Sequence, residues 1–354
     1  SGEARHIAVD NAAEIFKITA DNNKADAGLL EHMVVKIDSL DLKMTSDLNK
    51  KIDSLIAKLQ IGNLPPQEVA ALKKEMADTI ALKSQILLDR KENLAEILGA
   101  AKLQVIRTGD RSIFSDEVVN AVLGYLENSN QMADHNTTSQ ARTANLEGIV
   151  QVMQVFKEVG VELTSTQEDK LQGALVSALR VINDPSSVMG TLARVRDLMA
   201  GPDGKLTVVA AERVFILINI ALSNMKPQNM TEEKRTTILL FLQKTMSMMS
   251  MGIRAYVMGT PAGQELTRLV SELKIDPANT LGLRSGEPVG QLFGFKTIEN
   301  SLGAPRLQES SVSAAGTSGT RGPMVGQAEQ AAPIRQTESA ATQRTGERAT
   351  VDIV

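Results

Sequence analysis

Apolar residues recur every three or four positions through most of the first 275 residues, and this spacing predicts helices. The longest regular run covers residues 30–59, where aspartate and lysine fill the other faces. Gaps of three and four residues form a heptad seam with one interruption, which is typical of coiled coils. The seam positions are Leu30, Met33, Ile37, Leu40, Met44, Leu48, Ile52, Leu55 and Leu59.

A second apolar stripe occupies residues 67–98, after a break at Gly62, Pro65 and Pro66. Glycine supplies a left-handed helix cap, and proline is tolerated in the first turn of a following helix. Two long helices joined by such a short turn are expected to fold back antiparallel.

We therefore predict a long, coiled-coil-like antiparallel helical hairpin over residues 29–99. An N-terminal arm over residues 1–28 precedes it, with a short helix near residues 11–19. The pattern leaves two arrangements open. The hairpin either projects toward a partner or packs as two helices of an ordinary bundle.

We expect the helical pattern to loosen over residues 100–112. Shorter helical stretches follow and predict a multi-helix bundle, the helical body, over residues 112–275. Most of these stretches begin with residues that cap helix N-termini. Runs of β-branched residues are short and do not alternate, so we expect no strand. The predicted fold class is all-α. The predicted helix-opening residues are Ser115, Ser165 in a capping box with Glu168, Pro185, Thr207, Thr231 and Thr260.

The sequence TMSMMSMG at residues 245–252 places four of the chain's 15 methionines within a few positions. Met246 and Met249 continue a helical seam shared with leucine and isoleucine, which is typical of core side chains. Met248 and Met251 extend the apolar surface to a second side. We expect one long helix at the centre of a bundle, or one whose second side meets another subunit. A Cu(I) site is not favoured, because the two methionine pairs with one-turn spacing lie on different faces.

Composition changes after residue 275. Glycine becomes frequent in residues 276–300, which we predict to be a connecting segment. Residues 301–354 are rich in alanine, glycine, serine, threonine and glutamine. Such a segment cannot bury enough apolar surface to offset the entropy lost on ordering, so we expect a disordered C-terminal tail.

The chain of 354 residues has a net charge of −4, no cysteine, no tryptophan, two tyrosines and seven phenylalanines. The absence of cysteine excludes disulfides, thiolate metal sites and cysteine nucleophiles. A core with so few rings must consist of aliphatic side chains, which suits packing of helix on helix. The near-neutral charge gives no overall attraction to nucleic acid or to acidic membranes.

We expect neither a signal peptide nor a transmembrane helix. The N-terminal sequence lacks a cationic segment followed by an apolar run. Residues 214–222 are strongly apolar but shorter than the about 20 residues that span a bilayer. Residues 237–258 contain Gln243, Lys244 and Arg254. The expected location is the cytoplasm or an assembled particle.

We find no catalytic, cofactor-binding or metal-binding motif. The turn at residues 201–205 lacks the anchoring carboxylates of a calcium loop and the spacing of a phosphate-binding loop. The three histidines, His6, His32 and His135, are far apart in the sequence. Acidic pairs on amphipathic helices are typical of solvated faces. We therefore expect no enzymatic activity, no cofactor and no small-molecule substrate.

Scattered arginines leave nucleic-acid binding open as an alternative. Gathered on one side after folding, they would form a groove for a phosphate backbone. The sequence has no basic run and no aromatic ladder for base stacking, and Arg194 and Arg196 point to different helical faces. The candidate nucleic-acid contacts are Arg107, Arg111, Arg142, Arg194 and Arg196.

The sequence favours a non-enzymatic structural protein that self-associates into a larger particle or apparatus, such as a virion or a secretion machine. Its expected partner is itself, as a homo-oligomer. Two alternatives remain: a nucleoprotein that packages nucleic acid, and a membrane-active secreted protein whose residues 214–222 and methionine-rich helix insert into a bilayer. The expected self-association and packing residues are Ile37, Leu40, Met44, Leu48, Ile52, Leu55, Met246, Met248, Met249 and Met251.

Overall fold

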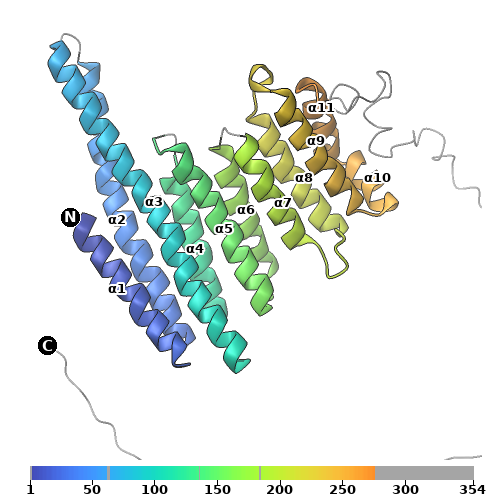
Figure 1. Ribbon diagram of the computed structural model, residues 1–354, viewed down its shortest axis with the longest axis horizontal. Helices are drawn as coiled ribbons and strands as arrows, with labels where there is room; N and C mark the ends of the chain where they lie inside the picture. The colour runs from blue at the N-terminus through green and yellow to red at the C-terminus, as the bar shows by residue number, and fades with distance from the viewer. Residues whose placement is uncertain (1, 62–63, 135, 183–184, 276–354) are drawn as a thin grey trace, which may run out of the picture. The chain divides into compact units, whose positions relative to one another are not determined.

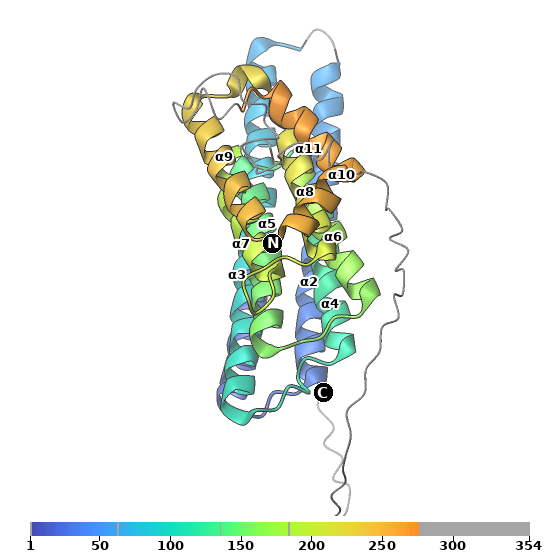
Figure 2. The same ribbon diagram turned by 90° about the vertical axis from the view of Figure 1, so that its right-hand side faces the viewer.

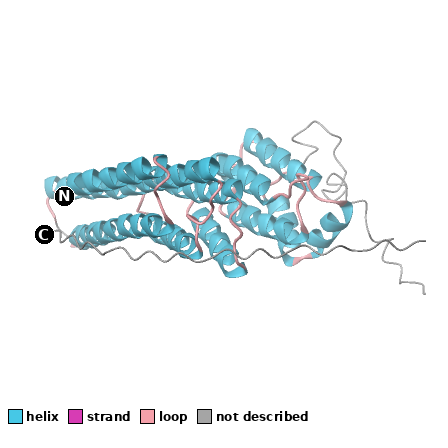
Figure 3. Cartoon of the chain, turned by 90° about the horizontal axis from the view of Figure 1, so that it is seen from below, coloured by secondary structure: helices cyan, strands magenta, loops and turns pink. Residues whose placement is uncertain are grey.

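The computed structural model describes residues 2–61, 64–134, 136–182 and 185–275, and within these ranges the chain is all-α with no strand (Figures 1 and 3). The predicted fold class is confirmed for this part of the chain. The predicted connecting segment and disordered tail, residues 276–300 and 301–354, lie outside it. The helices are α1 (Gly2–Asp21), α2 (Ala27–Gln60), α3 (Pro66–Thr108), α4 (Asp116–Met132), α5 (Ser139–Val159), α6 (Ser165–Arg180), α7 (Pro185–Met199), α8 (Val208–Ser223), the short 3₁₀ helix η1 (Pro227–Asn229), α9 (Glu232–Ser247), α10 (Met251–Gly259) and α11 (Pro261–Glu272).

Helices α2 to α9 form two layers, in which neighbours within a layer are two places apart along the chain. One layer holds α2, α4, α6 and α8, and the other holds α3, α5, α7 and α9. Figure 2 looks along this stack and shows the two layers side by side. One continuous apolar core runs from Val9 in α1 to Ile275 after α11. The aliphatic composition suits this packing, because leucine, isoleucine and valine fill the space between layers of helices.

The two longest helices, α2 and α3, pack on each other in a manner compatible with the predicted antiparallel hairpin. The prediction that the chain loosens at residue 100 is wrong, because α3 continues to Thr108. Gln104 stabilises this extension by accepting a hydrogen bond from Ala25 N (3.2 Å) and donating one to Ala25 O (2.7 Å). α3 then ends at Gly109, which has a left-handed φ of 72°.

The N-terminal residues form a longer helix than the one predicted near residues 11–19. α1 lies at one end of the stack, against α2 and α3 (Figure 1). It buries Val9, Ala13, Phe16 and Ala20 against the common core. These residues recur at gaps of three and four, so they share one face of the helix.

Helix N-termini follow the expected capping chemistry with one shift in register. Ser115, Thr207, Thr231 and Thr260 each accept a backbone hydrogen bond in the first turn of the helix that they precede, as predicted. The predicted capping box at Ser165 and Glu168 is wrong by one residue. Thr164 is the cap: its Oγ1 accepts from Gln167 N at 3.3 Å, and Gln167 Oε1 accepts from Thr164 N at 2.9 Å.

The methionine-rich segment is not one helix, contrary to the prediction. α9 ends at Ser247, and α10 begins after Ser250, which accepts a hydrogen bond from Ile253 N. The carbonyl of Met248 in the break accepts a hydrogen bond from Leu206 N at 2.8 Å. Serine favours caps over helix interiors, so this tertiary contact and the Ser250 cap together interrupt the helical pattern.

Candidate functional site

The hairpin seam differs from the predicted one at its centre. Ile37, Ile52 and Leu55 are buried, as packing residues should be, and Met44 and Leu48 are half-buried. Leu40, in contrast, is 42% exposed. The buried positions in that part of α2 are Asp41 and Thr45, one residue beyond Leu40 and Met44. Leu40 therefore lies outside the side of α2 that packs within the chain, because a buried charge occupies the inward position. Its predicted role in self-association stays a prediction.

The four methionines of the break separate into two groups. Met246, Met248 and Met249 are buried in the core of the helical unit. Met251, the first residue of α10, is 82% exposed. Three of them are therefore packing residues within the chain, and Met251 contributes nothing to that core.

The candidate nucleic-acid arginines do not gather into one groove. Arg111 donates to Gly160 O (3.5 Å) just beyond the end of α5, whereas Arg142 lies in the first turn of that helix and donates to Thr137 O. A helix of 21 residues is about 30 Å long. The two arginines therefore lie near opposite ends of α5.

The other three arginines are also separated. Arg107, at the end of α3, donates to Ala20 O at 2.6 Å. On α7, Arg194 is exposed and Arg196 is buried, which confirms that they occupy different faces. Arg196 donates to Thr245 Oγ1 (3.4 Å) and stacks over Phe241. Its guanidinium therefore makes its contacts within the core of the protein.

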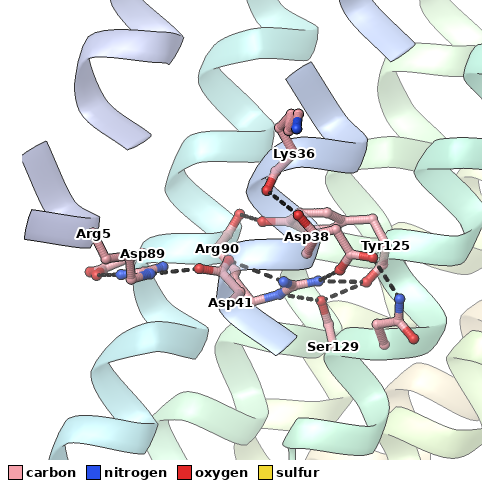
Figure 4. Close-up of polar contacts among 10 residues, drawn as sticks. Arg5, Lys36, Asp38, Asp41, Asp89, Arg90, Tyr125 and Ser129 are labelled. Atoms are coloured by element: carbon pink, nitrogen blue, oxygen red, sulfur yellow. Dashed lines mark hydrogen bonds and ion pairs between the residues drawn. The ribbon is translucent and has the colours of Figure 1, made fainter. Parts of the chain in front are cut away.

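A buried ion network, which was not predicted from the sequence, connects polar side chains of several helices (Figure 4). At its centre is Arg90 of α3, only 1% exposed. Its guanidinium donates to Asp38 Oδ1 (2.7 Å) and Asp41 Oδ2 (3.0 Å) of α2. It also donates to Ser129 Oγ and Tyr125 O of α4, both at 2.9 Å, and lies 3.7 Å from the centre of the Tyr125 ring.

The network continues to the end of the stack through Asp41. The second oxygen of this carboxylate, Oδ1, accepts a hydrogen bond from Arg5 Nε of α1 at 2.6 Å. Arg5 Nη1 also donates to Asp89 Oδ2 of α3 at 2.9 Å, and Asn128 of α4 donates to Asp38 Oδ2 at 2.6 Å. The buried ion network thus joins four helices, α1 to α4, through charge-assisted hydrogen bonds.

The charges of the network support one another. Burial lowers the pKa of Arg90, but the acidic groups of Tyr125, Asp41 and Asp38 outweigh it, and the net pKa lies above the ordinary value. The pKa of Arg5 is likewise raised, since bonds to Asp41 and Asp89 outweigh burial. Burial raises the pKa of the Tyr125 phenol. Both guanidinium groups therefore remain charged, and the phenol remains a hydrogen-bond donor, to Arg90 O at 3.0 Å.

The network positions the helices that its side chains join. Its carboxylates accept hydrogen bonds from arginine and amide groups, and its arginines donate to several acceptors each. The residues described include no group of three histidine, aspartate or glutamate side chains that could hold a metal ion. A sequence signal did exist: Asp41 follows Ile37 by four positions, so a carboxylate lies on the apolar face of α2. Such a charge on an apolar stripe indicates a buried partner.

A second feature is an uncovered apolar face on α1. Ile7, Ile15 and Ile18 are 54%, 60% and 53% exposed, on the side away from the buried face of the helix. The last turns of α3 carry two further exposed residues, Leu103 and Ile106. We call these five side chains the α1 face.

The two parts of the α1 face lie next to each other. Arg107 of α3 donates to Ala20 O in the last turn of α1, and Gln104 of α3 is bonded to Ala25 just after it. The end of α3 that bears Leu103 and Ile106 is thus held beside the end of α1 that bears Ile18. Ile18, Leu103 and Ile106 therefore lie on adjacent helix ends, whereas Ile7 lies about three turns away along α1.

Within the described residues, no helix has both the length and the apolar character needed to cross a membrane. Comparison of the chain with protein-family models, with curated proteins and with solved structures gives no match.

Proposed function

We propose that this protein is a non-enzymatic assembly subunit that associates with copies of itself through the α1 face. The observation that carries the proposal is that α1 is apolar on two sides. Its inner side, with Val9, Ala13 and Phe16, packs on the core, whereas its outer side bears Ile7, Ile15 and Ile18. A helix with two apolar sides is typical of one that packs between two neighbours.

The position of α1 in the stack strengthens this argument. In proteins built from stacked helices, each unit contacts only its neighbours, and the terminal units need a polar outer surface for solubility. α1 is the terminal helix at its end of the stack (Figure 1), yet its outer side carries three exposed isoleucines. Exposed apolar side chains gathered on one side of a helix are the kind of surface that marks an interaction site.

The α1 face suits a symmetric contact between two copies. Ile7 and Ile18 are separated by about three helical turns, so they lie on the same side near opposite ends of α1. If two α1 helices meet antiparallel, Ile7 of each copy faces Ile18 of the other. Such a contact uses the same surface twice, as two-fold symmetric dimers do.

Two competing functions receive less support from the geometry. A nucleoprotein would need a groove of cations, but Arg111 and Arg142 are far apart and Arg196 is buried. A membrane-active protein would insert residues 214–222, but these belong to α8, where Phe215, Ile218 and Leu222 are buried in the core. Insertion would require the core to open.

Sedimentation velocity over a range of concentrations, recorded at 260 nm and by interference, tests the proposal. The chain should associate as concentration rises, and Ile18→Lys should shift it toward the monomer. Val209→Lys, which adds the same charge at an exposed apolar position of α8, should not. A monomer at all concentrations would overturn the proposal. Strong absorbance at 260 nm would favour the nucleoprotein, because the chain has no tryptophan and two tyrosines.

A further inference from the structure

A cavity of about 500 Å³ opens between the end of α5, the loop after it, and helices α6, α7 and α8. Its volume falls within the range of roughly 300–1,000 Å³ that is usual for sites that enclose a ligand. The cavity is lined mainly by apolar side chains, and several of these are only partly buried against the core. Those partly buried residues are Met153, Val161, Leu163, Leu198 and Met199.

Few polar groups line the cavity, and each has a defined position. Lys157 donates to the backbone carbonyls of Leu198 (2.7 Å) and Ala200 (2.9 Å), which fixes the wall formed by the end of α7. Arg213 of α8 pairs with Glu168 of α6 at 2.8 Å. An apolar cavity with a small number of ordered polar groups is the usual composition of a binding site.

Two side chains at the cavity, one amide and one carboxylate, have polar atoms without a hydrogen-bond or ion-pair partner among the described residues. The Oε1 of Gln172 is buried and accepts no hydrogen bond there, although its Nε2 donates to Arg213 O at 3.5 Å. Glu162 is exposed and forms no ion pair with another described residue. The cavity therefore offers a buried acceptor for a backbone N–H and a carboxylate for a cation, which suits a peptide with a basic residue.

The chain itself contains a segment with large apolar side chains and a basic residue. All five phenylalanines of the described helices and loops are buried: Phe16, Phe114, Phe156, Phe215 and Phe241. The other two, Phe293 and Phe295, fall within the sequence Leu292-Phe293-Gly294-Phe295-Lys296 of a glycine-rich stretch. Aromatic side chains bury about 150–250 Å² each and dominate the energetics of contacts. Three large apolar side chains followed by a lysine are concentrated in these five positions.

We propose that Leu292, Phe293 and Phe295 dock in this cavity, with Lys296 beside Glu162. Met153 and Met199 line it with flexible, polarisable side chains that adapt to an aromatic ring. The described residues end at Ile275, and the linking residues 276–291 can extend about 60 Å at most. That reach suits docking within one chain or onto a neighbouring copy. The inference does not depend on the α1 face, because docking within a single chain needs no self-association.

A photo-cross-linking amino acid at position 293 of the full-length chain tests the proposal, since it replaces one aromatic side chain by another. Irradiation followed by mass spectrometry should place the cross-links on α5, α6 and the loop containing Leu163. Mixing chains labelled with heavy and light isotopes distinguishes a segment from the same chain from that of a neighbour. Either source supports docking in the cavity. Cross-links confined to other surfaces, or none, would overturn it.

Two variants and one control make the experiment specific. Leu163→Glu places a charge in the cavity at a half-buried position, and Phe295→Asp alters the segment. Each should lower the cross-linked yield by roughly tenfold or more, because a buried unpaired charge opposes binding. The same cross-linker at Val312, outside the segment, should not label the cavity. An unchanged yield in both variants would contradict the proposal, provided that circular dichroism shows native helix content.

Discussion

Arg90 and Asp41 form an ion pair, with 3.0 Å between Nη1 and Oδ2, and both side chains are removed from solvent. Removing two charges from water costs several kcal/mol per ion, and the attraction between them offsets this cost only where hydrogen bonds satisfy both groups. Here Asp41 binds a second arginine, Arg5, so the pair links α1 to the hairpin. The buried ion network therefore helps to hold the helix that bears the α1 face.

Replacement of Asp41 by leucine should destabilise the helical unit strongly. Arg90 and Arg5 would both lose a carboxylate while remaining buried, which typically costs about 3–5 kcal/mol. Urea unfolding measures the loss. As a control, Glu272→Ala breaks the pair of Arg268 and Glu272, whose side chains are about half exposed, and should change stability by no more than about 1 kcal/mol. Equal effects of the two changes would contradict the structural role of Asp41.

Loss of the Arg5 side chain should loosen α1 in preference to the rest of the stack. In Arg5→Met, the hydrogen bonds to Asp41 and Asp89 disappear, whereas Arg90 still neutralises Asp41. Hydrogen exchange should show faster exchange in residues 9–20 with little change in α5 to α8. Lys17→Met is the matched control, because its pair with Glu96 is half exposed and long at 3.5 Å.

The Tyr125 phenol should make stability fall at alkaline pH. Burial raises its pKa, so the folded chain keeps a proton that the unfolded chain loses above about pH 10. The buried phenol of Tyr125 therefore makes its full contribution to folding stability below that pH, and this contribution decreases as pH rises further. In Tyr256→Phe, where Tyr125 is the one tyrosine, absorbance at 295 nm should change only as the chain unfolds. A reversible change in the folded chain near pH 10 would contradict the burial of this phenol.

Mild peroxide should oxidise Met251 before the other methionines of the break. Oxidation follows exposure, and Met251 is 82% exposed whereas Met246, Met248 and Met249 are buried. Peptide mass spectrometry over a time course should find the sulfoxide at residue 251 first. Simultaneous oxidation of all four would mean that the core around the break is open.

The local pattern predicted helix existence well, because amphipathic spacing and capping residues act within one or two turns. The prediction failed where contacts with residues distant in the sequence determine the local structure. α3 continues past residue 100 because Gln104 forms hydrogen bonds with Ala25. The methionine-rich helix breaks where the backbone N–H of Leu206 donates a hydrogen bond to the carbonyl of Met248. Neither partner is close in sequence.

The buried ion network was missed for a related reason. A seam chosen by apolar character places Leu40 and Met44 inward, whereas the structure buries Asp41 and Thr45. A carboxylate is acceptable there because Arg90 and Arg5 approach from α3 and α1. The α1 face was missed because the predicted short helix did not reach Ile7, so its two apolar sides were not recognised.

A charge exchange across the α1 face, followed by sedimentation velocity, tests self-association through α1 most directly. Ile7→Lys and Ile18→Glu, each alone, should leave the chain monomeric at concentrations where the unmodified chain associates. The double variant should associate again, since an antiparallel contact places each introduced lysine opposite the glutamate of the other copy. Single variants that associate as strongly as the unmodified chain would contradict self-association through α1.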